Sequence, residues 1–254
     1  MIDSWRVIPL EEEDDSYMKM AKEEAIMHSL RKGISPPTLR FYSWKRPAVA
    51  LGYFQRAEDE LNLDLCKKDN VEVFRRITGG GAVYKSPQYE LNYSFIVRED
   101  EPFISKDVEQ SYKIICSAVI EGLRKLGFET KFKPINDIML DGRKVSGNAQ
   151  TRVDNVILHH GTILLKPTPE EMFKYIKIND KKLFEKKVKA AKDLVTGLNE
   201  IGNVTKEDIQ NSVIEGFSEI FRRSFFKSEL SNEEIDSANK VYKKYSDGEF
   251  IYCR

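Results

Sequence analysis

The chain has 254 residues, of which 41% are hydrophobic, enough for one large domain with a sizeable core. Its 41 basic residues balance 41 acidic ones, which argues against a general nucleic-acid binder. The amino terminus lacks the basic start and apolar core of a signal peptide, and no run approaches the roughly 18 apolar residues of a membrane span. We expect one cytoplasmic domain, residues 1–254, that binds neither nucleic acid nor membrane.

In chain order, WRVIPL predicts an opening strand, and a helix over about 16–32 follows it and ends at Gly33. Glu24 and His28 share one face of this helix, where an i,i+4 pair is favoured over a ligand role. Short strands are expected in TLRFYSW, AVALGYF, VEVFRRI, AVYK and LNYSFIV, with a polar helix at about 58–69.

The second half begins with helical spacing over about 107–127. Four strand-like runs follow, ETKFK, NDIML, KVSGNAQ and NVILHHGTILL, separated by DG and DN turn signals. From residue 168 onward the chain reads as mostly helical, with a helical carboxy-terminal segment at about 205–254. Regular βαβ alternation and a GxxxxGK[ST] motif are absent, which argues against Rossmann and P-loop folds. The pattern predicts an α+β fold with a mixed, largely antiparallel sheet flanked by helices.

The three cysteines, Cys66, Cys116 and Cys253, are widely spaced and form no CxxC pair or Cys/His cluster. This predicts reduced thiols and no zinc site. Because Cys116 lies among apolar residues of a helical stretch, we interpret it as a core residue rather than a nucleophile.

The stretch RRITGGGAVYK, residues 75–85, places three consecutive glycines after Arg75 and Arg76. Glycine weakens a strand, so its use here indicates a tight turn or a backbone that approaches something closely. Successive N–H groups can form a concave nest, and guanidinium suits phosphate or carboxylate. An anion-binding loop and an ordinary hairpin loop with solvated arginines both fit this stretch alone.

The stretch NDIMLDGRKVSGNAQ, residues 136–150, predicts a strand, a tight Asp141-Gly142 turn and a second strand. This hairpin would bring Asn136 and Asp137 near Lys144, and a lysine held by a carboxylate in a cleft can stabilise charge on a phosphoryl or acyl oxygen. An ordinary surface Lys–Asp pair, worth under about 1 kcal/mol, is the alternative. Small residues would let the backbone approach a flat ligand: Ser146, Gly147, Asn148 and Ala149.

Strand alternation puts His159 and His160 on opposite faces, so they cannot both bind one metal from this strand. No serine lies in a nucleophile-elbow motif, and no cysteine lies close to a histidine in sequence. Nucleophilic hydrolysis therefore has little support.

Together, RRITGGGAVY, NDIMLDGRKVSGNAQ and HHGTILL resemble the lipoate–protein ligase A family, and MAKEEAIMHS, ALGYFQ and VTGL extend the resemblance over essentially the whole chain. The resemblance implies a catalytic core like those of class II aminoacyl-tRNA synthetases and biotin ligases. The basic GRGRxGR loop typical of biotin ligases is missing.

In that family, lipoate reacts with ATP and Mg²⁺ to give lipoyl-AMP and pyrophosphate, and a lysine of a lipoyl-domain protein then displaces AMP. The resemblance implies oxoacid dehydrogenase E2 subunits and the glycine-cleavage H protein as acceptors. It makes Lys144 the catalytic lysine and Asp137 the tentative magnesium ligand, with Glu24, Thr78 and His160 on the lipoyl side. The remaining implied substrate- or nucleotide-binding residues are Arg76, Gly79, Gly80, Gly81, Ala82, Val83, Tyr84, Asn136, Ser146, Gly147 and Ala149.

Two features depart from the family pattern. Lys85 stands where the family usually has His. The chain also ends about where bacterial members continue into an accessory carboxy-terminal domain, as in the shorter archaeal type, so we expect a separate small accessory subunit.

The sequence also bears on two other functions. An ATP-independent octanoyl or lipoyl transferase of the same fold would use a cysteine on the loop before the lysine hairpin, where this chain has KFKPIND without one. A non-catalytic lipoate-binding module would not need the set of Arg76, Asp137 and Lys144. Both are disfavoured against the ligase.

Overall fold

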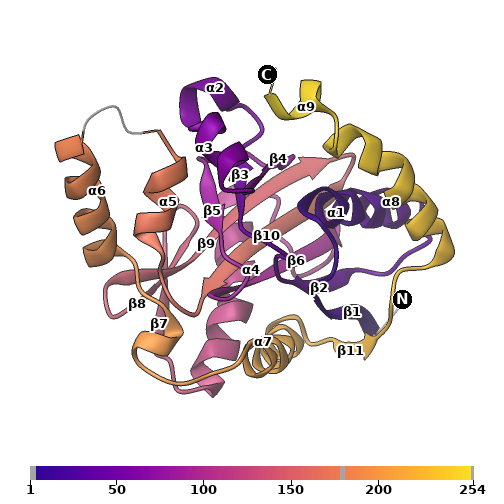
Figure 1. Ribbon diagram of the computed structural model, residues 1–254. Coiled ribbons are helices and arrows are strands. Elements are labelled where there is room, and N and C mark those ends of the chain that lie inside the picture. The colour runs from indigo at the N-terminus through magenta and orange to yellow at the C-terminus, as the bar shows by residue number, and fades with distance from the viewer. Residues whose placement is uncertain (1–3, 178–180, 253–254) are drawn as a thin grey trace.

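An eight-stranded mixed sheet is the centre of the protein, as the computed structural model shows for residues 4–177 and 181–252 (Figure 1). Its strands are β1 (Ser4–Glu11), β2 (Thr38–Tyr42), β6 (Glu90–Arg98), β7 (Thr130–Lys133), β8 (Asp137–Leu140), β9 (Arg143–Val153), β10 (Val156–Leu164) and β11 (Ser224–Lys227). They lie in the order β11-β1-β2-β6-β10-β9-β8-β7. β1 pairs in parallel with β11 and β2, and the other neighbours are antiparallel. The predicted α+β class with a largely antiparallel, mixed sheet is confirmed.

Two tight turns build the β8-β9-β10 meander that the sequence predicted. Asp141 and Gly142, with φ of 49° and 78°, join β8 to β9. Asp154 and Asn155, with φ of 51° and 66°, join β9 to β10. Positive φ at both central residues is the requirement of a type I′ hairpin turn, which Asp, Asn and Gly meet at the least steric cost.

A small second sheet stands beside the main one and carries the glycine loop. It contains β3 (Ala48–Leu51), β4 (Glu72–Arg75) and β5 (Val83–Lys85), with β3 in the middle. Residues 76–82, including the three glycines, connect β4 to β5. The loop is therefore held between a parallel pair, β3 with β4, and an antiparallel pair, β3 with β5.

Helices cover both faces of the main sheet (Figure 1). The helices are α1 (Ser16–Arg31), α2 (Ala57–Glu60), α3 (Leu63–Lys68), α4 (Val108–Lys125), α5 (Pro169–Tyr175), α6 (Lys181–Leu194), α7 (Lys206–Phe221), α8 (Asn232–Tyr245), α9 (Gly248–Tyr252) and the 3₁₀ turn η1 (Leu198–Glu200). On one face α4 and α7 pack in the main core with Ile157 and Ile163 of β10, whereas Leu158 faces α1. Alternation along β10 thus assigns its side chains to two layers. No helix of the described ranges is long and apolar enough to cross a membrane.

The structure corrects two sequence expectations. The helix predicted at about 58–69 is two short helices, because Leu61 is extended and bridges to Ile176, and Asn62 caps α3. The carboxy-terminal segment is not wholly helical, because Arg222 adopts φ of 52° and ends α7 before β11. Four residues of mostly exposed strand carry too little alternation to be recognised in sequence.

Cys116 is fully buried in the main core, as predicted, and Cys66 is a buried free thiol. Cys253 lies outside the described residues.

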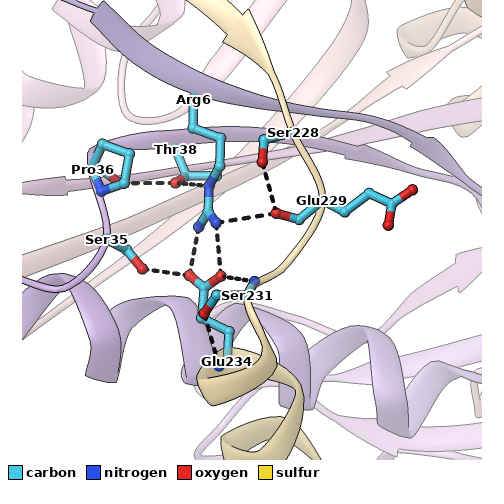
Figure 2. Close-up of polar contacts among 8 residues, drawn as sticks. All are labelled: Arg6, Ser35, Pro36, Thr38, Ser228, Glu229, Ser231 and Glu234. Carbon is cyan, nitrogen blue, oxygen red and sulfur yellow. Dashed lines mark hydrogen bonds and ion pairs between the residues drawn. The ribbon is translucent and has the colours of Figure 1, made fainter.

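A buried ion pair fastens the carboxy-terminal helix to the first strand. Figure 2 shows Arg6 of β1 pairing with both carboxylate oxygens of Glu234 at the start of α8, at 2.7 and 2.5 Å. The Ser35 hydroxyl and the Ser231 backbone N–H also donate to this carboxylate, at 2.6 and 2.8 Å. Burial alone would raise the pKa of Glu234, but these donors outweigh it and the pKa is lowered.

We predict that Glu234→Gln lowers the free energy of unfolding at neutral pH by about 3 kcal/mol, because it leaves Arg6 buried without its counter-charge. Since the folded-state pKa of Glu234 lies below its ordinary value of 4.5, the stabilisation is present above that value and is lost as pH falls through the folded-state pKa. Denaturant titrations between pH 3 and 8 would measure this. Glu233→Gln, at the exposed neighbouring position, is the control. Equal stability of the two variants at neutral pH would contradict the prediction.

Candidate functional site

A pocket of about 630 Å³ lies between the β9-β10 face of the main sheet, the glycine loop and the segment that leads into α5. Its walls are of two kinds. Met20, Trp44 and Phe74 provide apolar surface, whereas Arg76 and Lys144 provide positive charge. Such a cavity suits a ligand with an apolar portion and an anionic portion.

The glycine loop is pressed against the chain that follows β3. A Cβ atom added at Gly52 would lie 1.9 Å from the carbonyl oxygen of Gly80, so no side chain fits there. Gly80 has φ of 101°, a conformation that favours glycine. The Tyr53 N–H donates to the Thr78 carbonyl at 2.9 Å, which fastens the two segments. Gly52 and Gly80 are thus required by the backbone geometry, whereas a Cβ atom added at Gly79 or Gly81 would meet nothing within 4 Å.

Arg76 is a buried cation held only by carbonyl oxygens. It is 8% exposed and donates to Gly79 and Gly81 at 2.9 Å and to Ala50 at 3.3 Å. Within residues 4–177 and 181–252, no carboxylate forms an ion pair with it. Burial lowers the pKa of Arg76 to about 10. A buried charge without a counter-ion costs stability, so an anion bound in the pocket would compensate it.

Arg75 has a different, structural use. Its guanidinium donates to the carbonyls of Gly52, Tyr53 and Gln55 at 2.6–3.0 Å, and to those of Phe250 and Ile251 at 2.8 and 2.7 Å. The side chain is fully buried and does not line the pocket. Of the two adjacent arginines, only Arg76 is available to a ligand.

A β-bulge directs Lys144 into the pocket. Ile138 of β8 pairs with Ser146 and the next residue, Met139, pairs with Lys144, so Val145 is an extra residue on β9. Val145 packs in the main core. The bulge therefore restores Lys144 to the pocket face, which it shares with Gly147 three residues further along. Regular alternation would have placed the two on opposite faces.

On that face Lys144 forms the ion pair that the sequence predicted. Its Nζ lies 2.7 Å from Oδ1 of Asp137, the residue directly opposite Gly147. A Cβ atom added at Gly147 would lie 2.8 Å from the same Nζ, so glycine leaves the space that the lysine occupies. Asn136 and Asn148 brace the hairpin, each side-chain amide donating to the other residue's carbonyl at 2.5 and 2.9 Å. The result is a fixed ammonium group, half-exposed to the cavity.

His160 belongs to a buried polar row beneath the glycine loop. Its Nε2 lies 2.8 Å from the Thr78 hydroxyl, and its Nδ1 lies 3.1 Å from the carboxylate of Glu23. The Tyr42 hydroxyl donates to the same carboxylate at 3.0 Å. His159 lies on the opposite face, where burial lowers its pKa to about 3 and keeps it neutral. The two histidines diverge, as predicted.

The carboxylate that contacts His160 is thus Glu23, and the structure places Glu24 on another side of α1. One residue further along a helix turns by about 100°, and Glu24 instead accepts from Lys244 and Tyr245 of α8 at 2.7 Å and lies 3.9 Å from His28. The i,i+4 pair is confirmed. A signal for Glu23 was present, since it falls on the apolar stripe of α1 with Met20 and Met27, where an acidic residue must find a partner.

Ser146 is the second predicted residue that the structure does not bring to the pocket, because the bulge leaves it fully buried on the face of Ile138. Thr78 reaches the site through His160, and Asp137 reaches it through Lys144. The other predicted residues line the cavity: Arg76, Gly79, Gly80, Gly81, Ala82, Val83, Tyr84, Asn136, Lys144, Gly147, Ala149 and His160.

Lys85 also lines the pocket, inside a polar cluster that sequence reasoning had left without a role. Its Nζ lies 3.1 Å from Asn92 Oδ1 and 3.4 Å from Glu90 Oε1, and it donates to the Thr162 hydroxyl. Burial lowers the pKa of Lys85, although Glu90 opposes this shift. The cluster thus adds a further cation to the cavity, and Lys85, like Lys144, already has a carboxylate partner.

A magnesium site in this pocket would depend on the oxygen donors that the side chains around it provide. Within the described part of the chain, no three His, Cys, Asp or Glu side chains are grouped as metal ligands. Asp137 offers one carboxylate beside the cavity. Mg²⁺ that accompanies phosphates needs only one or two protein carboxylates, so this donor set fits such an ion without fixing it in advance.

The family model described as the lipoyl protein ligase A/B catalytic domain matches residues 15–218. The chain is 36% identical to the octanoyltransferase LipM of Clostridioides difficile (strain 630), over 98% of each chain. It is also similar to a solved archaeal lipoylation system, a bi-partite lipoate protein ligase and its E2 lipoyl domain from Thermoplasma acidophilum. That match has 30% identity and a TM-score of 0.90 and covers 98% and 96% of the two chains. A lipoate-protein ligase A bound with ATP matches with 28% identity and a TM-score of 0.85, over 98% of each chain.

We predict that Arg76→Gln weakens the binding of inorganic pyrophosphate by at least about tenfold, because a charged hydrogen bond contributes about 1.5–3 kcal/mol. Isothermal titration calorimetry would measure the affinity. Arg31→Gln, which removes an equal charge from the exposed pair with Asp154, is the control. If both variants bind as the unaltered protein does, Arg76 is not the anion-binding group.

Proposed function

The chain belongs to the lipoyl protein ligase A/B catalytic-domain family, and from that premise we propose that it is a lipoate–protein ligase. In this proposal, the carboxylate of lipoate attacks the α-phosphorus of ATP, a phosphorus–oxygen bond forms, and pyrophosphate leaves. The ε-amine of an acceptor lysine then attacks the acyl carbon. AMP leaves with the bonding electron pair, the amine loses a proton, and an amide remains.

The observation that carries the proposal is a buried Arg76 that has no carboxylate partner among the described residues, on the same cavity as the fixed ammonium of Lys144. Adenylation crowds negative charge between a carboxylate and a phosphate, where preorganised cations act most strongly. We assign Arg76 and the glycine loop to the adenylate phosphate. We assign Lys144 to the oxygens of the reacting carboxyl and phosphoryl groups.

The acyl portion is assigned to the apolar wall made by Met20, Trp44 and Phe74. His160 and Thr78, linked at 2.8 Å, form the polar edge of this wall, with Glu23 in the role expected of Glu24. Mg²⁺ would neutralise phosphate charge beside Asp137. The acceptors in this proposal are lipoyl domains of E2 subunits and the H protein. An accessory subunit would complete the enzyme, as the word bi-partite implies for the Thermoplasma ligase.

The alternative function is an octanoyltransferase that needs no ATP. It is favoured by the names of the curated relatives, such as the octanoyltransferase LipM that is 36% identical to this chain. Transfer through an enzyme thioester would need a reactive cysteine at the pocket. Of the cysteines in the described part of the chain, neither Cys66 nor Cys116 lines it, and burial raises the pKa of both thiols, that of Cys66 to about 11. These residues support the ligase, so it is the main proposal.

A comparison of acyl donors tests the proposal. We expect the chain to modify a purified lipoyl domain when given lipoyl-AMP, and also when given lipoate, ATP and Mg²⁺ with any accessory subunit it needs. Octanoyl-carrier protein without ATP should give no product. Mass spectrometry of the acceptor reports each transfer. Octanoyl transfer from the carrier protein, with none from lipoyl-AMP, would contradict the ligase and establish the transferase.

In the same assay, Lys144→Ala should lower the transfer rate by about 10²–10³-fold, because it removes the cation at the developing charge. Lys131→Ala, at an exposed position on β7, two strands away from β9, is the matched control and should keep full activity. A Lys144→Ala variant as active as the control would remove the lysine from the reaction.

A further inference from the structure

Residues 195–200, which follow α6 and include the 3₁₀ turn η1, lie against the part of β9 that carries Lys144. Val195 forms a parallel bridge with Lys144, and the Thr196 N–H donates to the Lys144 carbonyl at 2.9 Å. Val195 also lines the pocket beside the lysine. The segment therefore contacts both the backbone of Lys144 and the cavity into which its side chain points.

This contact fills a gap in the sheet. β10 pairs with β9 only as far as Ser146, opposite Ile163. Lys144 therefore has no partner on β10, although it pairs with Met139 of β8 on its other side. Lys144 directly precedes Val145, the extra residue of the bulge, where the ladder is locally disrupted. By bonding there, Thr196 supplies the partner that β10 no longer provides and fixes the backbone from which the lysine side chain departs.

Side-chain interactions also connect this segment to β9 next to Lys144. The Thr196 hydroxyl donates to Oε2 of Glu200 at 2.8 Å, and a guanidinium nitrogen of Arg143 lies 3.3 Å from that same oxygen. Arg143 is the residue directly before Lys144. Glu200 thus ties Thr196 to β9 on the amino-terminal side of the lysine, next to the backbone bond.

The segment itself has little freedom to shift. Leu198 is fully buried in the main core, and the Asn199 N–H donates to the Leu165 carbonyl at 2.9 Å. A Cβ atom added at Gly197 would lie 2.3 Å from the same carbonyl oxygen, so the two backbones are in contact. A rigid support against a bulged strand is a means of holding one side chain within a narrow range of positions.

We propose that Thr196 and Glu200 are positioning residues for Lys144. They touch no reacting atom and act by fixing the backbone and the preceding residue of the lysine. The proposal rests on the proposed function, because it takes Lys144 as the catalytic cation. A displacement of the order of 1 Å in such a group is enough to slow a reaction substantially.

The test is steady-state transfer from lipoyl-AMP to a purified lipoyl domain, a reaction that bypasses ATP activation. Thr196→Val and Glu200→Ala should each lower kcat about tenfold. KM for lipoyl-AMP should stay within about twofold in both variants, and Tm should stay within about 2 °C in Glu200→Ala, because Glu200 is exposed whereas Thr196 is fully buried. The double variant should lose no more than either single one, since the residues act as one unit.

Glu200→Gln distinguishes positioning from general destabilisation. Its amide oxygen still accepts from the Thr196 hydroxyl, so it should recover part of the kcat that Glu200→Ala loses. Glu121→Ala, which breaks a comparable Arg–Glu pair on α4 away from the pocket, should behave like the unaltered protein.

Two results would overturn the inference while leaving the proposed function intact. One is kcat within twofold of the unaltered protein in both single variants, with Lys144→Ala inactive. The other is a fall in kcat that tracks a fall in Tm and is not recovered by Glu200→Gln. Full activity of Lys144→Ala would instead overturn the proposed function.

Discussion

The pocket depends on a guanidinium that is buried among carbonyl groups. Arg76 reaches across the glycine loop to the carbonyls of Gly79 and Gly81, and so fixes the shape of the wall that a ligand would meet. The same geometry deprives it of a carboxylate, and its lowered pKa reports the cost of keeping the charge there. The uncompensated charge destabilises the free protein, and binding of an anion beside Arg76 would remove that destabilisation. The loop and the charge therefore act together: Gly52 and Gly80 allow the close backbone approach, and Arg76 makes the enclosed space selective for negative groups.

Lys144 provides the second cation of the cavity, and three separate features position it. The bulge at Val145 turns it toward the cavity, Gly147 leaves room for its ammonium group, and Asp137 holds that group at 2.7 Å. Each is a property of the β8-β9 hairpin or its immediate support. A cation that is held before the substrate arrives needs no rearrangement as charge develops, which is the basis of electrostatic catalysis. In the proposed reaction, Arg76 and Lys144 would act on the phosphate and on the reacting oxygens, while the apolar wall holds the acyl chain.

Local features of the site could be predicted from sequence, and features that depend on distant partners could not. The Asp141-Gly142 turn and the strand alternation at His159 and His160 follow from residue type and spacing, so the Asp137–Lys144 pair and the divergent histidines were predicted correctly. The bulge was not, because it is defined by the register between two strands. For the same reason the burial of Ser146 on the face of Ile138 was not predicted, and the choice between Glu23 and Glu24 required knowing which side of α1 faces α8. Likewise, the sequence around Arg75 and Arg76 does not show which of the two arginines supports the fold and which is available to a ligand. That difference arises only when α9 packs against β4.

The central claim is that the cavity is built for an acyl-adenylate, with the acyl chain, the carboxyl group and the phosphate bound together. The most direct measurement is calorimetric titration of the unaltered protein with a non-hydrolysable lipoyl-adenylate analogue and, separately, with lipoate alone. We predict that the analogue binds at least about 100-fold more tightly, because only the analogue presents a phosphate to Arg76 as well as an acyl chain to the apolar wall. Equal affinities for the two compounds would show that the phosphate gains nothing from the site and would contradict the account.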